Sequence, residues 1–453
     1  MAQEIDISDR TVCIIGLGYV GLTLAVTMAE NGFYVIGIER RGDIVADLRS
    51  GAVHFYEPDL QQKISRLISQ KKISFHSAIP ERCPADIYVV TVGTPLDDSG
   101  KVSIRSIEDS ITDIAVNAED GLLLIMRSTV KLGTTRNVVA PILDKHGLTY
   151  DLAYCPERTI EGHALKELRH LPQIIGGLTL PAVRRAAKIF QQITPTVVTV
   201  TDPETAEMIK LVDNAHRDVT FAYSNEIARI CDTVGISGIE VIEAGKISYP
   251  RTNLPTPGPV GGPCLSKDPH ILAEGVLEYG VEPEITKAAR YVNERQGVEI
   301  IETCVFILQN HLRVTEVRKI ALLGLAFKGK PATNDLRGSP AIQITALLKS
   351  FYPKSEFLGY DAIVEASDIS NLGLTPATSL EEAFDSAELI LILNNHPAFE
   401  FMDITHMASL MSRPGLIYDL WNLFDVRSLT LPEQTIYTGL GKLSDSGILK
   451  RKA

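Results

Sequence analysis

The sequence lacks the cysteine pattern of a disulfide-stabilised or zinc-binding protein. Six cysteines are spread over 453 residues, and none belongs to a C-x-x-C pair, so neither a disulfide framework nor a zinc knuckle is indicated. No group of His, Cys, Asp and Glu has the spacing of metal ligands, and no metal site is expected. This cysteine usage fits a reducing compartment, so we expect a cytoplasmic protein.

An excess of positive charge is missing as well. The 44 Lys and Arg residues are outnumbered by 56 Asp and Glu residues, which gives a net charge of −12. Neither nucleic acid nor an anionic membrane is therefore an expected partner. Residues 1–10 are polar and acidic, unlike the basic start of a signal peptide.

One uncharged stretch, residues 11–29, is nearly long enough to span a bilayer. Gly16, Gly18 and Gly21 interrupt it at turn-like positions, and its β-branched start is followed by a helical period. We therefore predict a strand, a turn and a buried helix, and no transmembrane helix.

The chain is too long for a single compact core. Short apolar runs alternate with amphipathic segments in the first third and again near the end, which is typical of parallel sheets covered by helices on both faces. Between them, residues 203–235 read as one long helix with Val212, Val219 and Tyr223 near one face. The predicted strands lie within 11–16, 34–39, 73–75, 86–95, 122–129, 319–327, 356–361, 388–395 and 416–420.

These patterns predict an α/β protein with two Rossmann-like doubly wound domains, joined by a long central helix and a helical connector domain. The expected divisions are a nucleotide-binding domain at 1–200, a central helical domain at 201–312 and a second α/β domain at 313–453.

A glycine-rich turn follows the first predicted strand. In the G-x-G-x-x-G pattern of Gly16, Gly18 and Gly21, the first glycine permits a tight turn, the second admits a pyrophosphate and the third lets helix pack on strand. The helix N-terminus favours the anion, and Tyr19 and Val20 complete the expected cofactor turn. A purely structural glycine turn is the alternative.

A carboxylate stands where a dinucleotide fold needs one. Glu39 ends the second predicted strand, and a carboxylate there accepts hydrogen bonds from a ribose 2′-hydroxyl and repels a 2′-phosphate. NAD is favoured over NADP, although the neighbouring Arg40 and Arg41 leave NADP open. Thr94 follows another predicted strand and is expected to border the same crevice.

A Pro/Gly-rich loop delivers Cys264 to the start of a predicted helix. The helix dipole and Lys267 both favour a thiolate there. A buried, inert thiol is the alternative, and it suits Cys13 and Cys304 better because both lie in apolar runs. Asp268 is a helix cap, a catalytic carboxylate, or both.

Two polar residues, Lys210 and Asn214, are four positions apart on the long predicted helix and share one face. Taken alone, this pair is more typical of a solvated helix face. Only the glycine turn and the cysteine loop make it a candidate for catalysis.

The chain resembles the UDP-glucose/GDP-mannose dehydrogenase family over nearly its whole length, because a series of motifs occurs in the family's order. The first are the glycine turn GLGYVG and RSTV with a following Gly-Thr pair. The others are CPERTIEGHAL, the K-x-x-x-N…NE pattern of the central helix, the loop PGPVGGPCLSKDP, and LGLAFKGKPATNDLRGSP.

The resemblance implies a role for each matching residue of the chemical centre. Cys264 matches the nucleophile. Lys210 and Asp268 would manage the proton of a sugar C6 hydroxyl, and Lys210 with Asn214 would stabilise an oxyanion.

Other matching residues surround the reacting water and sugar: Thr129, Glu157 and Glu161, with Glu157 as the base for hydrolysis. Gly261 and Lys328 would contact the substrate. The remaining two are Arg337, which matches a residue that contacts NAD, and Arg251, which matches an arginine that reaches a neighbouring subunit's substrate.

The resemblance implies a four-electron oxidation of an alcohol to a uronic acid, which consumes NAD twice. Thiolate addition retains the aldehyde as a thiohemiacetal, and the second oxidation gives a thioester that water cleaves. The first domain would hold NAD and the last one UDP, with candidates for UDP at strand ends: Tyr360, Asp361, Asn394, Asn395 and His396. For His396 a satisfied loop residue is the equal alternative. The central helix would form the core of a homodimer or higher homo-oligomer, and the product would serve polysaccharide biosynthesis.

Two strings bear on the sugar. C-P-E-R at 155–158 resembles the N-acetylhexosamine branch of the family, and N-A-H-R-D-V from Asn214 resembles the enzymes for UDP-N-acetylmannosamine. We rank this sugar first, then UDP-N-acetylglucosamine, with UDP-glucose and GDP-mannose less favoured. Arg158 and Arg217 would contact acetamido or phosphate groups, and a surface salt bridge is the equal alternative for each.

Two other functions compete with this interpretation. A two-electron dehydrogenase of the β-hydroxyacid type also combines a Rossmann domain with helices, but it needs neither Cys264 nor a second α/β domain. A catalytically silent NAD-binding sensor would not need the set of Cys, Lys, Asn, Asp and Glu described above.

Overall fold

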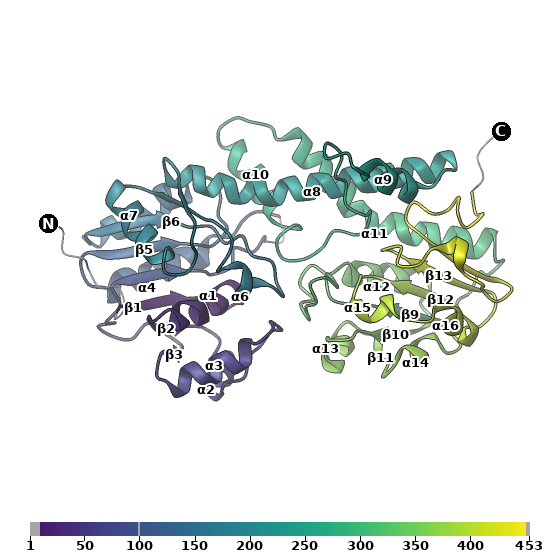
Figure 1. Cartoon of the computed structure of the whole chain (residues 1–453), viewed down its shortest axis with the longest axis horizontal. Coiled ribbons are helices and arrows are strands. Elements are labelled where there is room, and N and C mark those ends of the chain that lie inside the picture. Colours follow the sequence, from purple (N-terminus) through teal and green to yellow (C-terminus); the bar gives the residue numbers. More distant parts are fainter. Residues whose placement is uncertain (1–9, 98–99, 450–453) are drawn as a thin grey trace. The chain divides into compact units, whose positions relative to one another are not determined.

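The computed structural model describes residues 10–97 and 100–449. Residues 1–10, which the sequence predicts not to be a signal peptide, lie outside the described residues except for Arg10. The chain forms two compact units, residues 1–214 with 270–283 and residues 215–269 with 284–453. Each unit contains one β-sheet (Figure 1). The central helical region is shared between the units, and the predicted division into three domains stays a prediction.

The sheet of the first unit has eight strands in the order β3-β2-β1-β4-β5-β6-β7-β8. Neighbouring strands are parallel except β6 and β7. Strand order reverses between β1 and β4, which is the switch point where such sheets bind ligands. The strands are β1 (Thr11–Ile15), β2 (Tyr34–Ile38), β3 (Ile73–His76), β4 (Ile87–Val90), β5 (Leu122–Met126), β6 (Tyr150–Tyr154), β7 (Gln173–Gly177) and β8 (Val197–Thr199).

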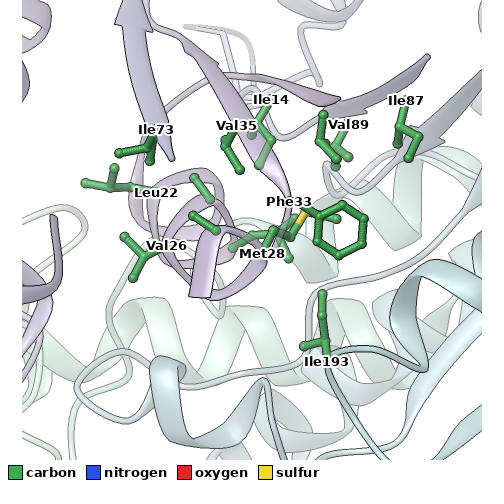
Figure 2. Close-up of a cluster of buried hydrophobic side chains, with 14 of the residues drawn as sticks. Ile14, Leu22, Val26, Met28, Phe33, Val35, Ile73, Ile87, Val89 and Ile193 are labelled. Atoms are coloured by element: carbon green, nitrogen blue, oxygen red, sulfur yellow. The ribbon is translucent and has the colours of Figure 1, made fainter. Parts of the chain in front are cut away.

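Both faces of this sheet are buried. Alternate residues of β1 enter different clusters, Val12 and Ile14 on one face and Cys13 and Ile15 on the other. Figure 2 shows the first cluster. The helices, including the π-helix η1, are α1 (Tyr19–Glu30), α2 (Gly42–Ser50), α3 (Leu60–Ser69), α4 (Arg105–Asn117), η1 (Thr135–Val139), α5 (Ala140–Lys145), α6 (Ala164–Glu167) and α7 (Leu180–Phe190). Burial on both faces explains why these strands read as continuous apolar runs.

The sheet of the second unit has six parallel strands in the order β11-β10-β9-β12-β13-β14, with its own switch point between β9 and β12. Its strands are β9 (Lys319–Leu323), β10 (Glu356–Tyr360), β11 (Thr375–Pro376), β12 (Leu389–Ile392), β13 (Gly415–Asp419) and β14 (Thr435–Gly439). Its helices are α12 (Pro340–Phe351), α13 (Ala366–Asn371), α14 (Leu380–Phe384), α15 (Pro397–Glu400), α16 (Ile404–Leu410) and the 3-10 turn η2 (Val426–Ser428). The predicted fold class, two doubly wound α/β sheets, is confirmed.

Four helices form the central region: α8 (Pro203–Val234), α9 (Gly238–Lys246), α10 (Asp268–Leu277) and α11 (Glu284–Asn310). The long helix predicted over 203–235 is therefore confirmed as α8, which has 32 residues. The apolar residues predicted near one face of this helix are not its buried ones. Val212 and Tyr223 are 48% and 53% exposed, whereas Glu207 and Asp218 are fully buried.

All nine predicted strands form, and five others were missed: β6, β7, β8, β11 and β14. The missed strands β8 and β11 have three and two residues, and β7 ends in two glycines, so their local patterns are weak. Among residues 10–97 and 100–449, no helix has the length and apolar character needed to cross a bilayer, and no group of potential metal ligands gathers.

Candidate active site

The glycine turn joins β1 to α1 with little freedom for other residues. Gly16 has a φ of +89°, and its N–H donates to the carbonyl oxygen of Ile38 at 2.8 Å. A Cβ at Gly21 would lie 1.9 Å from the carbonyl oxygen of Gly16, whereas a Cβ at Gly18 would meet nothing within 4 Å. Within the described residues no side chain caps α1, so its first N–H groups face this open turn, as an anion site requires.

Glu39 lies directly after β2, beside the glycine turn. Its carboxylate accepts hydrogen bonds from the N–H of Leu17 at 3.2 Å and of Arg41 at 3.0 Å. The neighbouring Arg40 is exposed and forms an ion pair with Asp109 at 3.5 Å. An open turn, a bare helix N-terminus and a carboxylate held at the end of the next strand together fit the pyrophosphate and ribose of NAD.

The hydroxyl of Tyr19 is engaged within the protein rather than left available for a cofactor. Its hydroxyl donates to the carboxylate of Glu57 and accepts from the N–H of Gly162 at 2.6 Å. Burial and the Glu57 carboxylate both raise the pKa of Tyr19. Glu57 also accepts from the N–H of Gly162 at 2.8 Å and of Leu165 at 3.2 Å, so it ties the cofactor turn to the segment that begins at Glu161. Any contact of Tyr19 or Val20 with NAD would be through the backbone or ring.

Thr94 and Thr129 lie at the carboxyl ends of neighbouring strands, β4 and β5. The buried hydroxyl of Thr94 donates to the carbonyl oxygen of Thr129 at 2.6 Å. Both predicted residues are thus at the sheet edge where a ligand would bind.

The carboxylate of Glu157 is buried and fully engaged. One oxygen accepts from Arg127 Nη2 at 2.6 Å, and the other accepts from the N–H of Arg158 at 2.7 Å and of Thr159 at 2.8 Å. Burial would raise the pKa of Glu157, but Arg127, the Thr159 N–H and Lys210 outweigh it and hold the pKa below its usual value. Glu157 is therefore ionised at neutral pH.

Lys210 and Asn214 belong to the buried face of α8. The positive charge of Lys210 is among the causes that lower the pKa of Glu157. Arg158 forms an ion pair with Asp213 at 2.8 Å, which is the salt bridge weighed against substrate binding.

Glu207, one turn before Lys210, binds the loop after β5. Its carboxylate accepts from the N–H of Gly133 at 2.6 Å and from the N–H and hydroxyl of Thr135 at 2.8 and 2.6 Å. Burial raises the pKa of Glu207 to about 7, although these hydrogen bonds oppose it. The Gly-Thr motif is thus attached to the helix that carries Lys210 and Asn214.

Cys264 is the single exposed cysteine, and the other five are buried. Its carbonyl oxygen accepts from the N–H of Lys267 at 3.1 Å and of Asp268 at 2.8 Å, so the cysteine occupies the turn that leads into α10. Helix α10 begins at Asp268. Asp268 is therefore the first residue of the helix and not, as predicted, the cap residue before it. The buried Asp268 carboxylate pairs with Lys267 at 3.0 Å.

The cysteine loop packs against the segment before α12. The N–H of Gly262 donates to the carbonyl oxygen of Gly338 at 2.9 Å. A Cβ at Gly261 would lie 2.5 Å from that same oxygen, and one at Gly262 would lie 2.5 Å from the ring of Phe327. The cysteine loop and the motif LGLAFKGKPATNDLRGSP are therefore in contact, and the glycines at 261 and 262 permit the close approach.

The other residues predicted to contact the substrate or NAD, Arg217, Arg251, Lys328 and Arg337, belong to the second unit. Arg337 is exposed and binds both carboxylate oxygens of Asp335 through Nε, at 3.0 and 2.9 Å. The ammonium of Lys328 lies 5.4 Å from the centre of the Phe327 ring. Arg217 and Arg251 are exposed.

The Asp, Asn and His residues proposed at strand ends for UDP have structural partners. Asn394 Nδ2 donates to the carbonyl oxygen of Ala326 at 3.2 Å, and Asn395 Oδ1 accepts from the N–H of Gly329 at 3.2 Å. Asp361 accepts from four backbone N–H groups, two of which belong to the loop after β9. His396 caps α15 through its Nδ1, which accepts from the N–H of Ala398 at 3.1 Å. These contacts fix the loops at the switch point.

The predicted residues of the chemical centre divide between the units. The first unit contains Thr129, Glu157, Glu161, Lys210 and Asn214, and the second contains Cys264, Asp268, Gly261, Arg217, Arg251, Lys328 and Arg337.

In the first unit, sequence reasoning missed three buried charged residues, Glu57, Arg127 and Glu207. Arg127 follows an otherwise apolar strand, and this interruption was a usable signal. Glu207 is three residues before Lys210 and so shares its helix face, but Glu57 gives no signal in a single sequence.

Comparison with known proteins identifies the family. The models of the UDP-glucose/GDP-mannose dehydrogenase family match in order, the NAD binding domain over residues 10–194, the central domain over 204–295 and the UDP binding domain over 321–426. The UDP-N-acetyl-D-mannosamine dehydrogenase of Pyrococcus horikoshii is 30% identical over 438 residues, which cover 95% of this chain and 99% of that protein. The NDP-N-acetyl-D-galactosaminuronic acid dehydrogenase of Ralstonia nicotianae is 31% identical over 428 residues, covering 90% and 96%.

The fold is similar to that of a solved relative. The structure of the UDP-D-ManNAc dehydrogenase from Pyrococcus horikoshii superposes with a TM-score of 0.86 at 29% identity, covering 96% of this chain and 99% of that one. With three family domains matched in order, the chain belongs to the UDP-glucose/GDP-mannose dehydrogenase family and is an NAD-dependent nucleotide-sugar dehydrogenase.

Proposed function

We propose that this enzyme oxidises the C6 alcohol of a UDP-N-acetylhexosamine to the carboxylate, with Cys264 as covalent catalyst. The observation that carries the proposal is the exposure of this one thiol, on a glycine-rich turn at the start of α10, while the other five are buried. An exposed thiol at a helix N-terminus is chemically suited to act as a nucleophile.

NAD, bound at the glycine turn, would accept one hydride from the sugar carbon in each oxidation. Lys210 and Asp268 manage the proton of the C6 hydroxyl as the aldehyde forms. The Cys264 thiolate then forms a carbon–sulfur bond to the aldehyde carbon, and Lys210 and Asn214 stabilise the oxyanion. After the second oxidation the carbon is a thioester, water attacks it, and the carbon–sulfur bond breaks to return the thiolate and release the acid.

The contacts of Glu157 refine its part in the last step. Its carboxylate is held by Arg127 and two backbone N–H groups, and its pKa is lowered. A group of such low basicity is suited to orient the attacking water rather than to hold its proton.

UDP-N-acetylmannosamine is the substrate we place first. The C-P-E-R string and the relatives whose names specify N-acetylated sugars support this choice. Because the Ralstonia relative is as similar as the Pyrococcus one, UDP-N-acetylgalactosamine joins UDP-N-acetylglucosamine and UDP-glucose as an alternative. We place the enzyme in the cytoplasm, where the Cys264 thiol would stay reduced.

The test measures NADH formed per sugar consumed, with each of these four UDP-sugars. Two NADH per sugar is expected with the preferred substrate, and one would overturn the four-electron reaction in favour of a two-electron dehydrogenase. Cys264→Ser should lower the turnover by orders of magnitude without unfolding the chain. Unchanged turnover by that variant would remove Cys264 from the mechanism.

A further inference from the structure

A buried polar network in the second unit borders the cysteine loop and has no part in the chemistry described above. It consists of Asp218 and Asn225 on α8 and Arg290 and Asn293 on α11, each at most 5% exposed. Arg290 Nη1 donates to Asp218 Oδ1 at 2.7 Å, and Asn293 Nδ2 donates to the same oxygen at 2.8 Å. Asn225 Nδ2 donates to Asn293 Oδ1 at 3.1 Å, which joins the four side chains.

The network reaches the loop on both sides of Cys264. Before it, Asn225 pairs with both backbone groups of Gly258, accepting from its N–H at 2.9 Å and donating to its carbonyl oxygen at 3.0 Å. After it, Arg290 Nη1 donates to the carbonyl oxygen of Leu265 at 2.8 Å. The cysteine therefore lies within a segment whose backbone is fixed at two points by buried side chains.

Stability alone does not account for these residues. Burial raises the pKa of Asp218 in spite of the Arg290 charge beside it, so the carboxylate is costly to bury in its ionised form. A buried ion pair is often no more stable than apolar residues of the same size. What apolar residues could not do is donate hydrogen bonds to the backbone of an irregular loop.

We propose that Arg290 and Asn225 are positioning residues for Cys264, which hold the loop 258–265 so that the sulfur is presented in one place. The proposal rests on the catalytic role proposed for Cys264. A nucleophile displaced by about 1 Å can lose on the order of 100-fold in rate. NAD is expected to bind at the glycine turn and not at this loop, so its KM should not change. Gly261 lies in the loop and is expected to contact the substrate, so the KM for the UDP-sugar rises while kcat falls.

The test compares Arg290→Lys and Asn225→Ala with wild type and with a matched control, Arg229→Lys. Arg229 is also on α8, and it pairs with Glu299 on α11 at 2.9 Å and with Glu226, so it joins the same two helices at the surface. We expect both network variants to lower kcat about tenfold or more, with the KM for NAD within about twofold of wild type. The control variant should match wild type in all three constants.

A second measurement reports on the loop without catalysis. Amide hydrogen exchange in the peptide over residues 255–267 should be faster in both network variants and unchanged in Arg229→Lys, at equal thermal unfolding midpoints. If Arg290→Lys does not fold, Asn225→Ala carries the test, because it removes no charge.

The outcomes separate the two proposals. Turnover by Cys264→Ser would defeat the covalent mechanism, and the exchange data would still decide whether the network holds the loop. Inactive Cys264→Ser together with wild-type kcat and exchange in Arg290→Lys and Asn225→Ala would overturn the positioning role. An equal loss of kcat in Arg229→Lys would also overturn it, because general packing of α8 on α11 would then be the cause.

Discussion

Arg127 places a positive charge beside the buried carboxylate of Glu157, at 2.6 Å. Arg127 is itself buried and also donates to the carbonyl oxygen of Cys155 at 2.9 Å and to Gln173 at 2.8 Å. Every polar bond of this guanidinium thus ends on the segment around Glu157 or on the strand beside it. Burial is the largest influence on the pKa of Glu157, and the charge of Arg127 is the largest of those that oppose it.

We predict that Arg127→Met moves the acid limb of the pH profile of kcat/KM to higher pH. Without the guanidinium, burial raises the pKa of Glu157, and the ionised form required for turnover is reached only at higher pH. Arg127→Lys keeps the charge and should shift the limb less. The measurement is initial rate against pH for the three proteins, with thermal unfolding as the folding control, because losing one partner of a buried pair costs about 3–5 kcal/mol. An acid limb that stays in place in Arg127→Met would show that Glu157 ionisation does not control the rate.

Among the elements, the turn between β1 and α1 offers a matched pair of substitutions. Both Gly18→Ala and Gly21→Ala add one methyl group, but a Cβ meets nothing within 4 Å at the first and the oxygen of Gly16 at 1.9 Å at the second. We expect Gly18→Ala to fold as wild type and to bind NAD about tenfold or more weakly, because the methyl group would occupy the approach of the pyrophosphate.

Gly21→Ala should instead lower the thermal unfolding midpoint and abolish NAD binding, because α1 cannot start in its present place. Calorimetric titration with NAD and thermal melts of the three proteins check both expectations. Wild-type affinity in Gly18→Ala would place the pyrophosphate elsewhere.

The attachment of α8 to the loop after β5 should depend on pH. Glu207 has a pKa of about 7 in the folded protein against an ordinary value of 4.5. Between these pH values the folded chain keeps a proton that the unfolded chain has released, so the free energy of unfolding falls as pH rises through this window. The loss is on the order of 3 kcal/mol, and it is complete above the folded pKa.

The measurement is denaturant unfolding from pH 4 to 8 for wild type, Glu207→Gln and the control Glu204→Gln. Glu204 precedes Glu207 on α8 and pairs with Arg136 at 2.6 Å. The stability of wild type relative to Glu207→Gln should decline with rising pH, whereas that relative to Glu204→Gln should stay level. Parallel curves for all three proteins would mean that Glu207 titrates as an ordinary carboxylate.

The elements also show what a single sequence can and cannot predict. Long apolar runs and the glycine turn are local signals, so β1 and α8 were predicted to within one residue of their bounds. The strands β4 and β5 begin within one residue of the prediction but end at Val90 and Met126, earlier than the predicted residues 95 and 129. Burial is not local. The spacing of Val212 and Tyr223 predicted that this face of α8 is buried. In the structure both residues are exposed, and the buried face carries Glu207, Lys210 and Asp218.

At the scale of the whole molecule, the sequence predicted the site residues that belong to family motifs and no others. Resemblance named Cys264, Lys210 and Glu157, because family motifs mark residues that touch ligands. It named neither Arg127 nor Arg290, which act on those residues from other strands and helices. Such partners become visible only when the fold brings distant segments together.

The assembly of the molecule gives the last prediction. The second unit leaves apolar side chains exposed along α8, between α8 and α9, along α9 and just after it: Tyr223, Ile230, Val234, Ile236, Val241 and Ile247. Exposed apolar side chains on two successive helices favour an interface, and a second copy of the chain is the occupant that the resemblance predicts. We expect the protein to sediment as a dimer or larger homo-oligomer, and Tyr223→Glu combined with Ile230→Glu to shift it toward the monomer. Leu180→Glu, at an exposed apolar position of the first unit, is the matched control and should leave the sedimentation unchanged.

Because Arg251 is predicted to reach a neighbouring subunit's substrate, dissociation should also raise the KM for the UDP-sugar more than the KM for NAD. A wild-type monomer at micromolar concentration, or a double variant that sediments as wild type, would contradict the interface.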